Sequence, residues 1–243
     1  MTLTGYEVRC PEGPLGLLKD VLFDDVLWGV RYLEVEPKEG FEERRVLVYP
    51  HTVRIPDGGV MTLATSMERR DLESGPVLRL GETISREMEA NLHEHFGWAF
   101  YWMPGAHHWA GHLSPPPPEE KDKEQEACRD EGDPHLRSIE EVTGYHIQAY
   151  DGGIGHVEDF VADDVTWRLR YMVVDTRNWL PGRKVIIFPE WIEDVDWTER
   201  KVRVTLGREM IKSAPEFEGP VQVDREYEGQ LFAHYRLSQY WSE

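Results

Sequence analysis

Two clusters of carboxylates offer the clearest cation-binding or acid–base chemistry in this sequence. Each cluster contains three aspartates, a tryptophan and an arginine at the same spacing: Asp20, Asp24, Asp25, Trp28 and Arg31 in the first, and Asp159, Asp163, Asp164, Trp167 and Arg170 in the second. Carboxylate oxygens are preferred ligands of Ca²⁺ and Mg²⁺, and paired carboxylates can act as general acid and base. The clusters indicate either a functional site or a β-hairpin whose turn requires aspartate.

Strand pairing favours the hairpin. If each hairpin is symmetric about the second of its paired aspartates and the following valine, Asp20 lies opposite Arg31, and Asp159 lies opposite Arg170. Opposite charges that face each other across a ladder stabilise it by up to about 1 kcal/mol. We therefore predict two structural ion pairs that serve the fold and not catalysis. The repeated carboxylates of a metal-dependent enzyme or sensor remain the alternative.

A group of histidines is the second candidate for metal chemistry. His107, His108 and His112 are near one another in sequence, but they lack the regular spacing with cysteine or carboxylate that is typical of a zinc site. His93 and His95 lie two residues apart on an expected helix, so their side chains point about 200° apart and do not share an ion. We expect no metal and no cofactor, with His107, His108 and His112 as weak candidates.

The charge and composition of the chain limit the classes of molecule that we expect it to bind. The chain has 243 residues, 40% of them hydrophobic, which is enough for one large or two small domains. Its 46 acidic residues exceed its 27 Lys and Arg, giving a net charge of -19. Because nucleic acids and anionic membranes bind basic surfaces, both are unexpected partners, and a basic protein is favoured. Without a signal peptide or an apolar run long enough for membrane insertion, a cytoplasmic location is expected.

The sequence contains an internal repeat without gaps. Residues 4–102 align with 143–241 at a constant offset of 139, with 27 identities in 99 positions. Such an alignment indicates tandem duplication. We divide the chain into a first copy at 1–103, a linker at 104–139 and a second copy at 140–243. The linker contains four consecutive prolines and a charged run, so we expect 114–135 to be irregular and exposed.

Each copy begins with short strands and ends with a helix. Runs rich in β-branched and aromatic residues predict strands at 28–35, 46–49, 154–162, 167–175, 185–188 and 201–206. Ser85 and Asp224 are good N-cap residues for helices over 86–96 and 225–235. Met88, Leu92 and Phe96, four residues apart, predict the buried face of the first helix. We expect a mainly β fold of two tandem small β-barrels, each followed by one amphipathic helix.

The second copy resembles the PRC-barrel family. The resemblance rests on Gly153-Ile154-Gly155-His156-Val157-Glu158-Asp159-Phe160, Asp163-Asp164, Trp167, Arg170-Tyr171, Val174-Asp175 and Trp179-Leu180-Pro181-Gly182-Arg183-Lys184-Val185. It implies the small barrel first described in the H subunit of the photosynthetic reaction centre. The sequence is most similar to free-standing bacterial PRC-barrel proteins of undefined function. The first copy departs from the pattern, since Gly40-Phe41-Glu42-Glu43 replaces Trp179-Leu180-Pro181-Gly182.

Aromatic residues at the end of each copy suggest a partner surface. They are Trp98, Tyr101, Trp102, Tyr240 and Trp241. Exposed aromatic side chains are enriched at protein interfaces, although such tails can also fold back on their own barrel.

The sequence offers no further catalytic signature. It contains no nucleophile motif, and no phosphate-binding loop precedes an expected helix. Cys10 aligns with Ala149, a small residue, which predicts a buried, inert thiol.

These patterns favour a non-catalytic scaffold or regulatory module. We expect the two copies to pack as an intramolecular pseudo-dimer about an approximate twofold axis and to bind a basic protein partner. The sequence leaves open whether the chain also assembles into homo-oligomers. The family resemblance alone also suggests a peripheral component of a photosynthetic or other electron-transfer complex.

Overall fold

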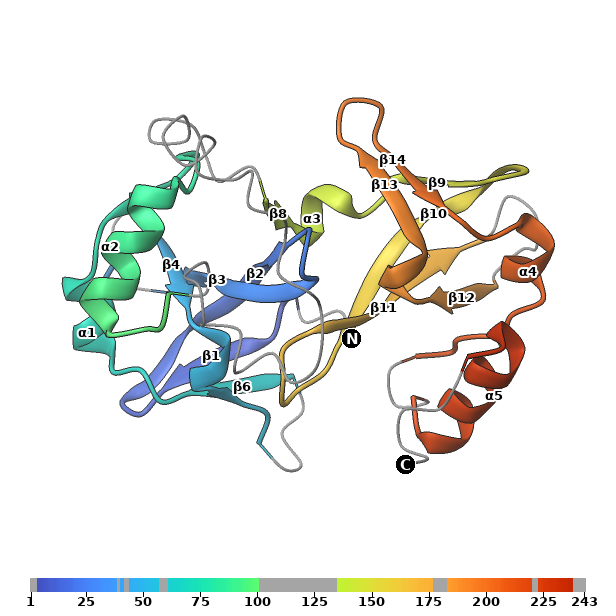
Figure 1. Ribbon diagram of the computed structural model, residues 1–243. Coiled ribbons are helices and arrows are strands. Elements are labelled where there is room, and N and C mark those ends of the chain that lie inside the picture. Colours follow the sequence, from blue (N-terminus) through green and yellow to red (C-terminus); the bar gives the residue numbers. More distant parts are fainter. Residues whose placement is uncertain are drawn as a thin grey trace. The chain divides into compact units, whose positions relative to one another are not determined.

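The computed structural model describes residues 4–38, 40–41, 44–56, 61–100, 135–176, 183–219 and 223–237 (Figure 1). The chain divides into two compact units. The N-terminal unit comprises Leu3–Ser138 with Asp164–Arg168, and the C-terminal unit comprises Ile139–Asp163 with Leu169–Glu243. The N-terminal unit therefore includes a turn from the second copy of the repeat, held by the Val30 N–H, which donates to the Trp167 carbonyl at 2.8 Å.

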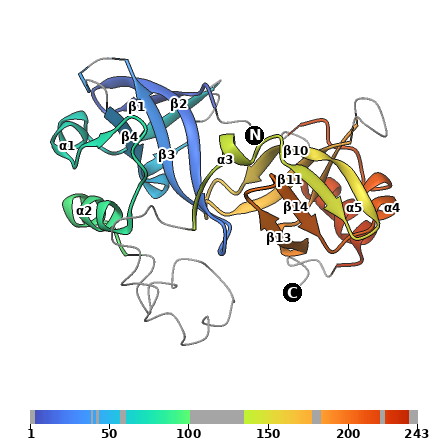
Figure 2. The same ribbon diagram turned by 90° about the horizontal axis from the view of Figure 1, so that it is seen from above.

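The N-terminal unit is one sheet with two helices (Figure 2). Its strands are β1 Glu7–Cys10, β2 Gly13–Asp24, β3 Gly29–Pro37, β4 Arg44–Val48, β5 Val53–Arg54, β6 Thr62–Thr65, β7 Leu78–Arg79 and β8 Leu136–Ser138. They lie in the order β5-β6-β1-β2-β3-β4-β7, and β8 also pairs with β2. The helices are α1 Arg69–Ser74 and α2 Arg86–Phe96, with a 3-10 turn at Pro50–Thr52.

The C-terminal unit repeats this arrangement. Its strands are β9 His146–Ala149, β10 Gly152–Ala162, β11 Leu169–Asp175, β12 Lys184–Ile187, β13 Ile192–Asp196 and β14 Lys201–Val204, in the order β12-β11-β10-β9-β14-β13. Its helices are α3 Ile139–Val142, α4 Arg208–Lys212 and α5 Arg225–Tyr235, with a 3-10 turn at Pro189–Trp191. In both units the first strand runs parallel to a late one, β1 with β6 and β9 with β14, at registers that differ by 139 residues.

The fold is mainly β, as expected, but the sheets differ from the expected barrels. Within the described residues neither sheet closes, because its outermost strands do not pair with each other. In the N-terminal unit these strands, β5 and β7, are two residues long. Ladders of that length provide too few hydrogen bonds to close a sheet. The structure therefore shows two open sheets of the same strand order.

Burial explains the central strands. Every residue of β3 from Gly29 to Val35 is buried, so this strand is covered on both faces. Its two buried charged side chains are each held in an ion pair, Arg31 with Asp24 and Glu34 with Arg45. Strand β11 is nearly as buried, with five consecutive buried residues from Tyr171 to Asp175. The six strands expected from the sequence are confirmed as β3, β4, β10, β11, β12 and β14, with small shifts at their ends.

The two long helices begin and end where the sequence predicts. The Ser85 hydroxyl accepts a hydrogen bond from the Met88 N–H, and the Asp224 carboxylate accepts one from the Tyr227 N–H. Each bond satisfies a backbone donor that the first turn of a helix leaves free. The predicted buried face of α2 is only partly right. Its fully buried side chains are Glu89, Leu92 and His93, while Met88 is half-buried.

Two glycines allow the strands of each main hairpin to approach closely. A Cβ atom at Gly16 would lie 2.0 Å from the Glu36 carbonyl oxygen, and one at Gly155 would lie 2.0 Å from the Asp175 carbonyl oxygen. Gly155 also has a φ of +107°, which other residues rarely adopt. Only glycine fits at these crossings.

The expected linker is described only at its end. Residues 114–134 of the segment expected to be irregular lie outside the described residues. From Leu136 to Ser138 the chain forms β8, which pairs antiparallel with β2 from Asp24 to Leu22. The sequence did not predict this strand.

Candidate functional site

The hairpin between β2 and β3 does not have the register predicted from its charges. Glu34, not Arg31, lies opposite Asp20. In the second hairpin Val173, not Arg170, lies opposite Asp159. A β-bulge near each aspartate and a second one near the turn shift the pairing. Bulges add an unpaired residue to one strand, so a symmetric count from the turn fails.

The arginines instead pair with aspartates at the turns. Arg31 Nη2 lies 3.1 Å from Asp24 Oδ2, and Arg170 Nη2 lies 3.0 Å from Asp163 Oδ2. The other Asp24 oxygen accepts hydrogen bonds from the Val26 and Leu27 N–H groups, at 3.0 and 2.7 Å. Asp24 therefore fixes both the turn and the arginine.

Three of the remaining aspartates of the clusters also form contacts within the fold. Asp20 Oδ1 accepts a hydrogen bond from the next N–H at 2.8 Å, and Asp159 Oδ1 does the same. Asp25 lies 2.9 Å from the Arg137 guanidinium and 3.0 Å from His135 Nδ1. Each of these contacts uses carboxylate oxygens that a cation or a substrate would otherwise bind.

We expect the two turn ion pairs to differ in strength because they differ in burial. The side chains of Arg31 and Asp24 are 3% and 10% exposed, whereas those of Arg170 and Asp163 are 36% and 23% exposed. Double-mutant cycles with Asp→Asn and Arg→Met should give a coupling energy of about 2 kcal/mol for the buried pair. The exposed pair should give less than about 1 kcal/mol. Asparagine keeps an oxygen that can accept the hydrogen bonds of the turn, so the cycles measure the effect of the charge alone. Equal coupling energies for the two pairs would show that burial does not determine their strength.

A triad of a buried tyrosine, a buried glutamate and a more exposed arginine occurs in both units. In the N-terminal unit the Tyr32 hydroxyl donates to Glu89 Oε1 at 2.9 Å, and Arg86 Nη1 lies 2.9 Å from Glu89 Oε2. The corresponding residues of the C-terminal unit are Tyr171, Glu228 and Arg225, with distances of 2.5 and 2.8 Å. Each triad joins the central strand, β3 or β11, to the long helix.

His93 extends this network in the N-terminal unit only. Its Nε2 lies 2.9 Å from the Tyr32 hydroxyl, and its Nδ1 lies 2.8 Å from the Ala99 carbonyl. The hydroxyl has one proton, which serves either Glu89 or His93. Burial lowers the pKa of His93 to about 4, although the hydrogen bond to the Ala99 carbonyl opposes the shift; the nearby Arg31 guanidinium contributes in the same direction as burial. The C-terminal unit has Phe232 at this position.

Aromatic rings surround His93. Trp98 stacks on Phe96 and Tyr49, with ring centroids 4.6 and 4.8 Å apart, and Phe100 stacks on His93 at 5.7 Å. Trp98 is 9% exposed, so its expected role in a partner surface is wrong. It packs back on its own unit. The other expected surface residues, Tyr101, Trp102, Tyr240 and Trp241, lie outside the described residues.

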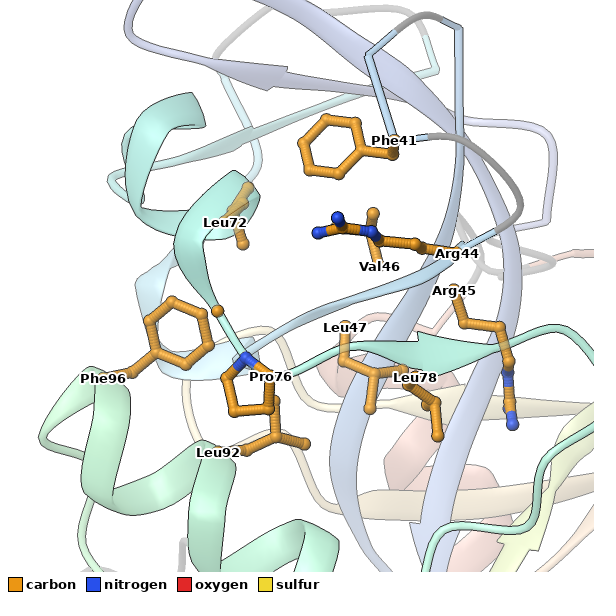
Figure 3. Close-up of a pocket in the computed structure, with 11 residues that line it drawn as sticks. Phe41, Arg44, Arg45, Val46, Leu47, Leu72, Pro76, Leu78, Leu92 and Phe96 are labelled. Carbon is orange, nitrogen blue, oxygen red and sulfur yellow. The ribbon is translucent and has the colours of Figure 1, made fainter.

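A shallow pocket lies between β4 and the helices of the N-terminal unit. Figure 3 shows the Arg44 guanidinium between Phe41 and Leu72, while Arg45 points away. The rest of the lining is mainly apolar, with Phe96 and Gly75 on the helical side. Arg44 already donates to the Glu73 carbonyl at 3.1 Å. The pocket can take a small apolar group, but none of its lining residues is a nucleophile or a carboxylic acid.

The C-terminal unit shows why this pocket exists. There Ala214 takes the place of Gly75 and is fully buried, and Tyr235 takes the place of Phe96. The Tyr235 hydroxyl donates to the Ile186 carbonyl at 3.0 Å. The pocket is therefore space that larger side chains fill in the other copy.

The remaining candidates from the sequence are a cysteine and several histidines. Cys10 is buried, as expected, and burial raises its thiol pKa to about 11, so it is not a nucleophile at neutral pH. His107, His108 and His112 lie outside the described residues. His95 is exposed, whereas its counterpart His234 has its Nε2 2.9 Å from the Met210 carbonyl.

In the described part of the chain, one group of potential metal ligands comes together: His156, Glu158 and Asp175.

Comparison with known proteins assigns neither a family nor a function to the chain. No model of a protein family matches the chain, and no curated protein matches it. None of the helices in the described ranges is both long and apolar enough to cross a membrane.

Proposed function

We propose that this protein is a non-catalytic interaction module that binds a basic protein partner. The observation that carries the proposal is the use of the repeated acidic groups. Asp24 and Asp163, which both copies retain, pair with arginines at the turns, and Glu89 and Glu228 are buried beneath tyrosines. Duplicated residues of this kind maintain a scaffold. A net charge of -19 then favours a basic partner through electrostatic complementarity.

The hairpin tips are the part of the scaffold that we propose for contact. Val26 and Val165 occupy equivalent turn positions and are 51% and 78% exposed. Both copies retain this valine beside paired aspartates. An exposed valine at each tip suits an apolar residue of the partner, and the net negative charge of the chain favours lysines or arginines around that residue.

The family resemblance fits this proposal. We propose that each copy is a divergent PRC-barrel domain and that the copies are related by an approximate twofold axis. The shared strand order and the equal registers of β1 with β6 and of β9 with β14 support a common fold for the two copies. A duplicated scaffold of this kind would present two similar tips to a partner.

The proposal is tested by crosslinking the tagged full chain in its own host cells and identifying the captured proteins. We expect a partner with a high isoelectric point. In a pull-down without crosslinker, its retention should fall as salt is raised from about 50 to 200 mM, because the attraction is electrostatic. The double variant Val26→Ser/Val165→Ser should lose the partner. Val77→Ser, which changes a valine that is 43% exposed elsewhere on the N-terminal unit, should keep it.

Two results would contradict the proposed function. One is a partner that the tip variant and the Val77→Ser variant retain equally. The other is the capture of acidic proteins only, which a chain of this charge repels.

A further inference from the structure

A row of polar residues crosses five strands of the C-terminal sheet. His146 of β9 lies opposite His156 of β10, which lies opposite Asp175 of β11. Lys201 of β14 continues the row beyond His146, and Lys184 of β12 continues it beyond Asp175. Directly opposed residues point to the same face of a sheet, with Cβ atoms about 4.5–5.5 Å apart. The row therefore places two imidazoles and a carboxylate together.

A bulge adds a second carboxylate. The β10–β11 register shifts between Val157 and Asp159, so Glu158 is the extra residue. His156 Nε2 lies 3.9 Å from Glu158 Oε2 and 3.9 Å from Asp175 Oδ2, and the three ligand atoms all lie within 4.8 Å of one another. Bulges re-aim side chains in this way, often at functional sites.

We propose that this face binds a divalent metal ion of the zinc class, with His156, Glu158 and Asp175 as ligands and His146 as the fourth. A point equidistant from the three ligand atoms lies at most about 2.5 Å from each. Zinc bonds to imidazole nitrogen and carboxylate oxygen measure about 2.0–2.2 Å, so the atoms need to move inward by only a few tenths of an ångström. His146 completes the set by a change of rotamer, because it already faces His156.

Burial and charge both favour a cation. Asp175 is fully buried, and a carboxylate out of water is strongly stabilised by a nearby positive charge. Lys184 Nζ lies 2.6 Å from Glu158 Oε1 and leaves Oε2 to face His156. The two carboxylate ligands carry two negative charges, and the contact with Lys184 offsets one of them. The nitrogen ligands favour zinc over calcium or magnesium, which prefer oxygen alone.

The N-terminal unit provides an internal control. At the same positions of its sheet the row consists of Thr62, Glu7, Leu17 and Glu36, and Lys19 replaces Glu158. This row contains no imidazole, so it does not favour zinc. The two copies have the same strand order and differ in the residues proposed as ligands. The residues of the first copy can therefore be used as substitutions in the second.

The test is a titration of the untagged, EDTA-treated full chain with Zn²⁺ against a chromogenic chelator. We expect one ion bound at this site and a rise in unfolding temperature that depends on zinc concentration. His156→Leu, the residue of the first copy, should weaken binding by at least about 100-fold, the upper end of the effect of residues that only orient a ligand. Leu17 is 43% exposed at the equivalent position, so the variant should fold.

Two further variants distinguish this site from zinc bound elsewhere on the chain. Lys184→Met should tighten zinc binding several-fold, because it removes a positive charge beside the ion. The triple variant His107→Ala/His108→Ala/His112→Ala should leave the affinity unchanged. The proposal is overturned if the unsubstituted chain binds no zinc, if His156→Leu binds as tightly, or if the triple variant abolishes binding.

Discussion

Replacing Gly155 with alanine should destabilise the C-terminal unit by more than about 3 kcal/mol. The added Cβ would lie 2.0 Å from the Asp175 carbonyl oxygen, where no real contact is tolerated. Moving β11 away would break the ladder at His156 and Asp175, which lie opposite each other beside the crossing. The φ of +107° adds backbone strain for any side chain. Urea unfolding followed by fluorescence measures the loss.

Gly153→Ala is the matched control, two residues earlier on the same strand. Its Cβ would have no neighbour nearer than 3.9 Å, which is ordinary packing distance. We expect a change in the free energy of unfolding within about 1 kcal/mol. Equal effects of the two substitutions would show that the close crossing of β10 and β11 does not constrain the sequence.

The stability of the N-terminal unit should fall as the pH is lowered from about 6.5 to about 4. Burial lowers the pKa of His93 from 6.5 to about 4, so in this range the unfolded chain binds a proton that the folded chain does not. The free energy of unfolding therefore rises with pH here, and its full contribution is present above about pH 6.5. A shift of this size corresponds to roughly 3 kcal/mol between the two limits.

His93→Phe provides the comparison, because Phe232 occupies the equivalent position of the other unit, where it is buried and packs edge-to-face on Phe188. The variant keeps the hydrogen bond from Tyr32 to Glu89 and removes the titrating imidazole. Urea midpoints of the two proteins should be measured from pH 4 to 7.5. The difference between them should change between about pH 4 and 6.5, where only the unsubstituted chain loses stability through His93, and should be constant above pH 6.5. Parallel curves would mean that His93 does not titrate as its burial predicts.

The helices were the most predictable part of this fold. Their start is specified locally, because Ser85 and Asp224 each bond an N–H three residues later. The register of the hairpins was not predictable in the same way. It depends on bulges, such as the one between Leu18 and Asp20, which the residue types do not reveal. The predicted position of Arg31 directly opposite Asp20 was wrong for that reason.

The buried carboxylates were missed because the helix was interpreted by its apolar residues alone. Glu89 and Glu228 are buried although a charged side chain normally favours the surface. A signal was present, since Tyr32, Arg86 and Glu89 are all identical to their counterparts in the second copy. Identity between copies at a charged position of an apolar helix face indicates a buried network.

The histidine row could not be found from spacing. His146 and Asp175 are far apart in sequence, and His156 meets both only because β10 lies between β9 and β11. Strand order and register, which the sequence left open, bring these residues together. Neither copy carries an obvious ligand motif.

The position of β8 determines how the chain can be divided. β1 pairs with the early part of β2, from Gly13 to Leu17, and β8 pairs with its later part, from Leu22 to Asp24. A fragment ending at residue 103 would contain the whole first copy of the repeat but would lack β8. Its β2 would then present unpaired N–H and C=O groups next to Phe23, which is a template for association between chains. The unit that folds therefore extends past the unit that was duplicated, and fragments ending after Ser138 should resist aggregation better than fragments cut at the repeat.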